Sequence, residues 1–361
     1  MTRDRGEDAR LIALAVLAIA ALLILPGTLD FSTAYGLISA IPMALLGLSL
    51  GLIWGYGGIL CFGQTAFFGI GAYAYAVWAV NFGDTTGAVV CAIVLGAAFA
   101  AALGYFIFYG RVSDVYLGAI TLVVTLVLLQ VMRRTSGPEY KIGDALLGGF
   151  NGTGAPPMRV PWDTGTMLIG PPLLYVSLGA LIVCYFVCVA ITRSHFGRVC
   201  VAIRENETRA ELLGYDARLY KLGLFAIGGG LAALAGVLSG LAVTRVTPEL
   251  FNLKNAATAI ILVIVGGRGT LIGPVIAAFG IFYLQKSLGS QQTVNLDLVL
   301  GALLIGFVLL LPQGLVPAVM TLVLRRSGRR RDFKATRRGR RPGRAATRTG
   351  RGVDRDLQAA E

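Results

Sequence analysis

The sequence has very few of the residues on which enzyme active sites and metal centres depend. It contains a single histidine, His195, and five cysteines in 361 residues. No two cysteines form a C-x2-C pair, so no spacing predicts a zinc site. A G-x4-G-K-[ST] phosphate loop and an H-E-x-x-H helix are also absent, and one histidine disfavours a histidine-based catalytic triad. We therefore expect no enzyme activity, no metal or cofactor bound by this chain, and no ATP hydrolysis by the chain alone.

Charged residues are also scarce. They make up 14% of the chain, whereas hydrophobic residues make up 56% and the mean hydropathy is +0.73. This composition lies outside the ordinary soluble class and predicts a polytopic membrane protein.

The net charge of +13 is concentrated at the C-terminal end. Residues 325–361 hold 14 Lys and Arg against 4 Asp and Glu, a charge of +10, which leaves +3 for the rest of the chain. Nucleic acid is therefore not an expected partner of the protein. Because this segment lacks apolar periodicity and is rich in glycine, we expect a basic, disordered cytoplasmic tail that is attracted to anionic lipids.

Apolar runs recur along the chain at about the 20-residue length that a membrane-spanning helix needs. A further apolar stretch, 256–284, is interrupted by GGRGT (266–270), so it forms either two short crossings or one re-entrant hairpin. The sequence thus predicts an all-α polytopic membrane protein with 8–10 transmembrane helices, some of them broken or re-entrant. The other runs are 11–25, 32–53, 57–80, 86–109, 115–132, 167–191, 222–243 and 296–320.

The first run, 11–25, is open to two interpretations, a retained helix or a signal peptide. Its leader carries three arginines and three acidic residues, and no small-x-small cleavage site follows it, which favours the retained helix. With residues 1–10 inside, the positive-inside rule places 192–221 and the tail inside as well, because inside positions before the tail hold 11 Lys and Arg against 7 outside. We expect an inner or plasma membrane protein with both termini in the cytoplasm.

The interiors of the apolar runs contain almost no ionisable residues. Gln64 and Gln130 are their main polar side chains, apart from scattered Ser and Thr. Ion-coupled carriers usually need intramembrane carboxylates, histidines or broken-helix ion sites. A pump driven directly by protons is therefore disfavoured, whereas a passive channel stays open.

The segment IRENETRAELLGY (203–215) concentrates charge between two apolar runs. Asn206 is a good N-cap residue and Gly214 suits the position after a helix, so we expect a short helix over 207–213. A helix of this length is marginal in water and must be held by a surface. It is either an amphipathic loop helix on the protein's own inner face or a docking helix for a partner. Its apolar side would comprise Ala210, Leu212 and Leu213.

Four stretches, taken together, resemble one known family. They are GQTAFFGIGAY (63–73), the charged loop and following helix from SHFGRVC to AGVLSG (194–240), GGRGTLIGPVIAAFG (266–280) and LPQGLVP (311–317). Their content and order resemble the LivM-type permease subunits of branched-chain amino-acid ABC importers, and the related UrtC-type permeases of urea importers. The resemblance covers roughly residues 35–320.

The resemblance implies an ABC importer permease fold in three regions: a cytoplasmic N-terminus (1–10), a transmembrane permease domain (11–324) that includes a cytoplasmic ATPase-coupling loop (192–221), and the tail (325–361). It implies a subunit that translocates branched-chain or other hydrophobic amino acids by ATP-driven alternating access, with ATP bound by partner subunits. The expected partners are a homologous second permease in a heterodimer, two cytoplasmic ABC ATPases and an extracytoplasmic solute-binding protein.

In ABC importers the corresponding loop carries an E-A-A-x3-G pattern that docks onto the ATPase. Aligned on Gly214, this chain has Thr208, Arg209 and Ala210, so the Glu and the first Ala are missing and the individual contacts stay open. The coupling residues that we expect are Arg204, Glu205, Asn206, Glu207, Arg209, Ala210 and Gly214.

Glycines interrupt both halves of the apolar domain. We interpret most of them, as in Gly236-x3-Gly240, as positions that let helices pack closely, whereas a few point to a pathway near the middle of the membrane. The candidates for the translocation path are Gly63, Gln64, Phe67, Gly267, Arg268 and Thr270.

The substrate stays open between two classes. The stretches LIWGYGGIL and GGRGTL are at least as close to urea-type members as to amino-acid-type members, so a urea or short-amide importer permease is the alternative. A stand-alone channel for small neutral solutes is a further alternative, and a membrane-anchored enzyme lacks any evident catalytic residues.

Overall fold

The computed structural model describes residues 31–110, 112–160 and 163–289, together with Leu22, Gly301, Gly306 and Gly314. These residues belong to the unit Met1–Ala318. The predictions for residues 1–10 and for the tail 325–361 lie outside the described residues, as do those for nearly all of the apolar runs 11–25 and 296–320.

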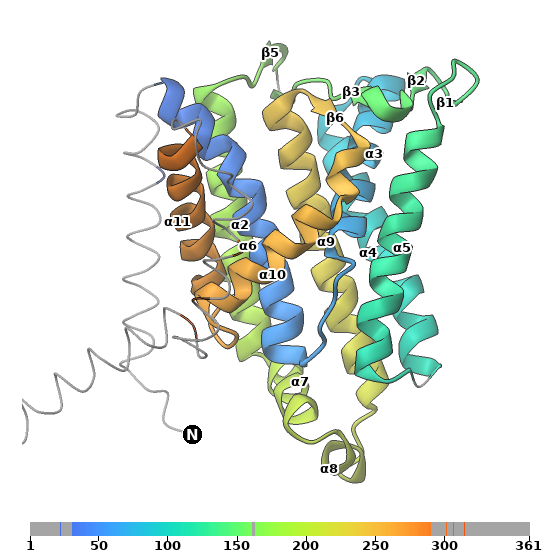
Figure 1. Ribbon diagram of the computed structural model, residues 1–361, viewed down its shortest axis with the longest axis vertical. Helices are drawn as coiled ribbons and strands as arrows, with labels where there is room; N and C mark the ends of the chain where they lie inside the picture. The colour runs from blue at the N-terminus through green and yellow to red at the C-terminus, as the bar shows by residue number, and fades with distance from the viewer. Residues whose placement is uncertain are drawn as a thin grey trace, which may run out of the picture. The chain divides into compact units, whose positions relative to one another are not determined.

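Six of the described helices are long and apolar enough to cross a membrane. A hydrocarbon core about 30 Å thick needs about 20 helical residues, and these helices have 19 to 27. They run alongside one another in Figure 1, which confirms the all-α polytopic fold class. They are α2 (Phe31–Gly57), α3 (Gln64–Phe82), α4 (Thr85–Tyr109), α5 (Asp114–Arg134), α6 (Pro171–Arg193) and α9 (Ala217–Val243).

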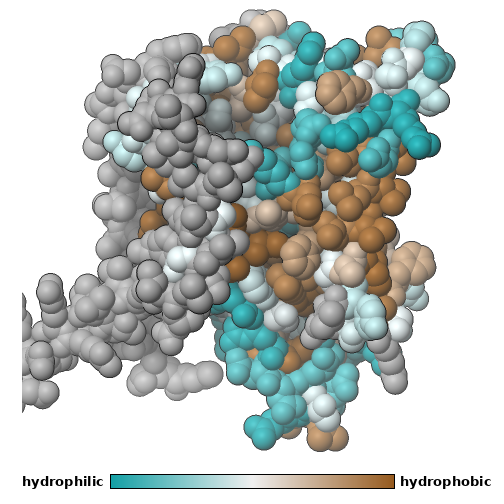
Figure 2. All heavy atoms as spheres, in the orientation of Figure 1, coloured by the Kyte–Doolittle hydropathy of each residue, from teal (hydrophilic) through white to brown (hydrophobic). Residues whose placement is uncertain are grey.

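The apolar middle of the molecule separates two different ends. Outside the grey atoms, Figure 2 shows hydrophobic residues at mid-height and hydrophilic residues toward the top and the bottom. The bottom end in Figure 1 carries α7 (His195–Glu205) and α8 (Glu207–Leu212), and the opposite end carries the connection between α5 and α6.

The connection between α5 and α6 contains several short strands and one 3-10 helix. Glu249 of the 3-10 helix η2 (Pro248–Phe251) forms an ion pair, 2.7 Å long, with Arg133 in the last turn of α5. Two hydrogen bonds to the Glu249 carboxylate hold its pKa below the usual range, the larger effect coming from Arg133 and the smaller from Asn252. Within the connection, β1 (Lys141–Ile142) pairs with β2 (Ala145–Leu146), β4 (Arg159–Val160) pairs with β5 (Asp163–Met167), and η1 (Gly149–Asn151) lies between these two pairs in the sequence. The remaining strand, β3 (Thr153–Gly154), pairs with β6 (Arg245–Val246), which follows α9.

The apolar run 57–80 begins as an extended segment and not as a helix. α2 ends at Gly57, residues 58–63 are non-helical, and α3 starts at Gln64. Gly58 has a φ of +74°, which only glycine adopts readily, and a Cβ there would lie 2.7 Å from Arg204 Cγ. Glycine therefore suits this turn for two reasons, the positive φ and the side chain of Arg204 that occupies the space beside it.

The apolar stretch 256–284 is broken at GGRGT, as the sequence predicts. α10 (Leu253–Gly266) and α11 (Ile272–Gly289) run in opposite directions in Figure 1. With 14 residues, α10 is about 21 Å long, shorter than a membrane core. The two helices meet closely, since a Cβ on Gly266 would lie 2.2 Å from the Gly273 carbonyl carbon.

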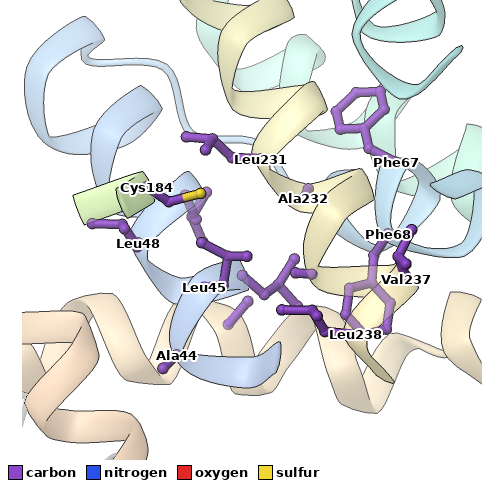
Figure 3. Close-up of a cluster of buried hydrophobic side chains, with 14 of the residues drawn as sticks. Ala44, Leu45, Leu48, Phe67, Phe68, Cys184, Leu231, Ala232, Val237 and Leu238 are labelled. Atoms are coloured by element: carbon purple, nitrogen blue, oxygen red, sulfur yellow. The ribbon is translucent and has the colours of Figure 1, made fainter. Parts of the chain in front are cut away.

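Close approach of backbones builds the core around α9, which packs against α2, α3 and α4. A Cβ on Gly71 of α3 would lie 2.3 Å from the Ala233 carbonyl oxygen, and one on Gly236 of α9 would lie 1.8 Å from the Phe68 carbonyl oxygen. This confirms the packing interpretation at these glycines. Figure 3 shows Leu238 of α9 beside Phe68, within one buried cluster that also includes Leu45 of α2.

Gly236→Ala should destabilise the folded protein, because the added Cβ would overlap the Phe68 carbonyl. Overpacking of this kind costs about 1–3 kcal/mol, so the midpoint temperature of thermal unfolding should fall. It is measured in detergent, with size-exclusion chromatography as the readout of folded protein. Gly179→Ala in α6 is the matched control, since nothing lies within 4 Å of its added Cβ and alanine favours the helix. Equal midpoints for the two variants would contradict the packing account.

Candidate coupling surface and translocation path

The predicted coupling loop (192–221) begins with a helix, α7, that sequence reasoning missed. Ser194 caps it by accepting a hydrogen bond from the Gly197 N–H at 3.3 Å. Its buried face consists of Val199, Cys200 and Ile203, a spacing typical of an amphipathic helix that was readable in the sequence. Burial raises the pKa of the Cys200 thiol to about 12, so this cysteine is a packing residue.

The short helix predicted from Asn206 and Gly214 is present as α8. The Asn206 side chain accepts a hydrogen bond from the Arg209 N–H at 2.8 Å, and Gly214 follows the helix with a φ of +90°. The helix ends at Leu212, one residue before the predicted end. The caps confirm the local structure; the role of these residues in coupling stays a prediction.

Two contacts hold α8 on its own chain. Ala210 is 3% exposed and packs with Val199 and Ile203 of α7. Glu207 forms an ion pair with Lys221 of α9, in which Lys221 Nζ lies 2.6 Å from Glu207 Oε2. The direction of α8 is therefore fixed relative to α7 and α9.

The rest of the predicted apolar side does not pack against the described chain. Leu212 is 84% exposed and Leu213 is 72% exposed. Glu205, Arg209 and Glu211 are exposed as well. The outward surface of α8 therefore combines two adjacent leucines with charges of both signs.

Arg204 faces a different way from these residues. Its guanidinium group donates hydrogen bonds to the Gly55 carbonyl oxygen at the end of α2 and to the adjacent Glu205 carboxylate. Arg204 thus links the predicted coupling loop, to which it belongs, to the last turn of α2.

A polar cavity of about 470 Å³ lies beside α8. Arg218 lies in its wall, and its guanidinium carbon is 5.9 Å from the centre of the Tyr109 ring. The cavity therefore separates the start of α9 from the turn between α4 and α5. Its lining comprises Phe108, Val112, Ser113, Glu207, Thr208, Glu211, Arg218 and Lys221.

The first group of path candidates lies inside the helix bundle. Gln64 is 1% exposed, and its side-chain amide donates to Ser49 Oγ, which in turn donates to the Gly228 carbonyl oxygen at 2.8 Å. Gln64 Oε1 has no hydrogen-bond partner within the described part of the chain. Phe67 packs edge-on to Phe225 with ring centres 5.4 Å apart, and Gly63 lies against Thr121.

The second group lies at the break between α10 and α11, against the last turn of α2. The guanidinium carbon of Arg268 lies 4.5 Å from the centre of the Trp54 ring. Thr270 donates a hydrogen bond to the Gly267 carbonyl oxygen at 3.2 Å. A Cβ on Gly314, from the LPQGLVP motif, would lie 2.3 Å from Gly267 Cα, so the two late motifs meet at this point.

The two groups of path candidates contact α2 at different heights. Gln64 contacts Ser49, and Arg268 contacts Trp54, which lies five residues or about 7.5 Å further along the helix. The second half of α2 is thus the element that both groups share with Arg204.

Comparisons with known proteins identify the family of this chain. The family model described as "Branched-chain amino acid transport system / permease component" matches residues 32–310. The high-affinity branched-chain amino acid transport system permease protein LivM of Escherichia coli K12 is 30% identical over 327 residues, which cover 85% of this chain and 74% of the relative. The protein of the same name in Salmonella typhimurium LT2 is 28% identical, covering 90% and 78%.

A more distant relative is named for a different substrate. The ribose import permease protein RbsC of Escherichia coli K12 is 26% identical over 270 residues, which cover 71% of this chain and 75% of the relative. No solved structure gives a significant match. Since the family model spans most of the sequence, this chain belongs to the family of permease components of branched-chain amino acid transport systems.

Proposed function

We propose that this chain is the membrane permease subunit of an ABC importer that translocates branched-chain or other hydrophobic amino acids by ATP-driven alternating access. Separate ATPase subunits bind and hydrolyse the ATP. A homologous second permease completes the membrane part, and an extracytoplasmic binding protein delivers the solute. α7 and α8 receive the movement of the ATPase, and the helix bundle carries the solute path.

The surface of α8 is the observation that carries this proposal. A helix of six residues does not form alone in water, and here Ala210 and the Glu207–Lys221 ion pair fix it to its own chain. Leu212 and Leu213 are nevertheless left largely exposed. A rigidly held helix that presents apolar anchors within a charged rim suits docking to another protein.

The end of the molecule that carries α8 is the cytoplasmic end in this proposal. The positive-inside rule supports it, because the loop and its flanks are rich in basic residues. The loop lies at the opposite end from the strands between α5 and α6, which would then face the binding protein. The basic residues are Arg193, Arg198, Arg204, Arg209, Arg218 and Lys221.

Gln64 is the strongest candidate for the solute path. Its Oε1 atom is buried without a partner among the described residues, which costs about 1–3 kcal/mol. This cost supports a second state of the transporter in which water or the solute amino group reaches that oxygen. Closed packing around Phe67 and Gly63 suits the shut state of an alternating-access cycle.

Replacing both exposed leucines, Leu212→Ala with Leu213→Ala, should abolish co-purification of the ATPase, because these side chains are the apolar anchors of α8. Burial of a leucine side chain contributes about 1.5–3 kcal/mol, which corresponds to a loss of about tenfold or more in affinity for each residue replaced. The measurement is affinity purification of the full-length permease from membranes, with the ATPase quantified.

The matched control is Leu146→Ala with Leu253→Ala, two leucines of 51% and 47% exposure located away from α8. This pair should retain the ATPase. If the α8 pair retained it equally well, α8 would be resting on lipid headgroups and the docking role would be wrong.

Proteoliposomes that contain the permeases and ATPases, supplied with the binding protein, should accumulate labelled leucine only when ATP is present. Excess isoleucine or valine should compete with leucine for uptake, because an apolar side chain defines the proposed class of substrates. Excess urea should not compete. Uptake of urea in place of leucine would assign the urea-type alternative. Uptake without ATPases would indicate a passive channel.

A further inference from the structure

The last turn of α2 is held from one side by the break between α10 and α11. Arg268 lies over the Trp54 ring at 4.5 Å, and the Tyr56 hydroxyl lies 3.5 Å from the Gly269 carbonyl oxygen. Gly55 lies beside the same segment, since a Cβ there would be in van der Waals contact with the Arg268 carbonyl oxygen at 3.8 Å. A guanidinium group over an aromatic face is attracted by the ring quadrupole, most strongly by tryptophan.

The same turn is held from the other side by the coupling loop. The Arg204 guanidinium donates to the Gly55 carbonyl oxygen, one of the terminal carbonyls that α2 cannot satisfy within itself. The stem of Arg204 crosses the backbone at Gly58, where any side chain would collide with it. Cations near a helix C-terminus are also favoured by the helix dipole, and this turn has two of them.

The turn is packed against the central helix as well. A Cβ on Gly57 would lie 2.5 Å from the side chain of Leu224 in α9. The last turn of α2 therefore has little room to move independently of its three neighbours, since well-packed elements transmit displacement and do not absorb it.

We propose that Arg268 is a positioning residue, which together with Arg204 makes the last turn of α2 the link between the coupling loop and the α10–α11 break. This inference rests on the proposed function of α8 and extends it. A displacement of α7 and α8 moves Arg204, the turn at Trp54–Gly58 follows, and Arg268 carries the movement to the broken helix pair. The cation–π contact between Arg268 and Trp54 transmits the last part of this movement. Its strength therefore determines how much of the movement of the ATPase is converted into transport of the solute.

The test is the number of leucine molecules transported per ATP hydrolysed by the complete transporter in proteoliposomes, with ATPase co-purification recorded for each variant. Arg268→Met keeps the length of the stem and removes the charge, and should lower this ratio about fivefold or more while the ATPase stays bound. Arg268→Lys should restore the ratio to within about twofold of the wild type.

Variants of the ring test the same contact from its other side. Trp54→Phe should keep most of the ratio, whereas Trp54→Leu should lower it as Arg268→Met does. The double variant with Trp54→Leu and Arg268→Met should be no worse than either single variant, because both remove one interaction. A role in stability alone would lower yield and unfolding temperature without changing the ratio.

Gly179→Ala in α6 is the control. Nothing lies within 4 Å of the added Cβ, and the position belongs neither to the predicted coupling loop nor to the path candidates, so this variant should leave the ratio unchanged. The inference is overturned if Arg268→Met transports at the wild-type ratio, or if Arg268→Lys is as impaired as Arg268→Met. Failure of the wild-type permease to retain the ATPase would overturn the proposed function instead, and this inference with it.

Discussion

The carbonyl groups at the end of α2 need hydrogen-bond donors, and much of the described structure depends on how they obtain them. Non-helical backbone at membrane depth must find its partners within the protein. The Gly58 N–H donates to the Trp54 carbonyl at 3.2 Å, and the Ile59 N–H donates to the Ile53 carbonyl at 3.4 Å. Arg204 donates to the next carbonyl along the helix, that of Gly55. The turn that ends α2 is therefore shaped by the coupling loop as well as by its own sequence.

The same half of α2 is joined to α9 by polar and apolar contacts together. Ser49 donates to the Gly228 carbonyl and accepts from Gln64, at a level where glycines bring α9 close to α3 and α4. In lipid, helices associate through such close packing and through interhelical hydrogen bonds, because lipid tails are as apolar as leucine. A chain with so few charged residues can therefore still specify which helices lie together.

The sequence was informative where a single segment decides its own structure. Long apolar runs predicted the spanning helices, Asn206 and Gly214 predicted α8, and GGRGT predicted the break. The sequence was less informative where the local structure depends on residues that are distant in the chain. The turn at Gly58 depends on Arg204, which lies far along the chain, and β3 pairs with β6 across some ninety residues. Gln64 and Arg268 were predicted as path candidates because of their residue types, but their contacts with α2 could be identified only from the folded structure.

The burial of Cys200 has a practical consequence for chemical studies of this protein. Because burial raises the pKa of this thiol to about 12, the thiol is almost entirely protonated at neutral pH. Only the thiolate reacts readily with alkylating agents and oxidants. The native cysteine nearest to α8 is thus nearly inert, so a probe attached through an engineered cysteine on that helix would report from the chosen position and not from α7.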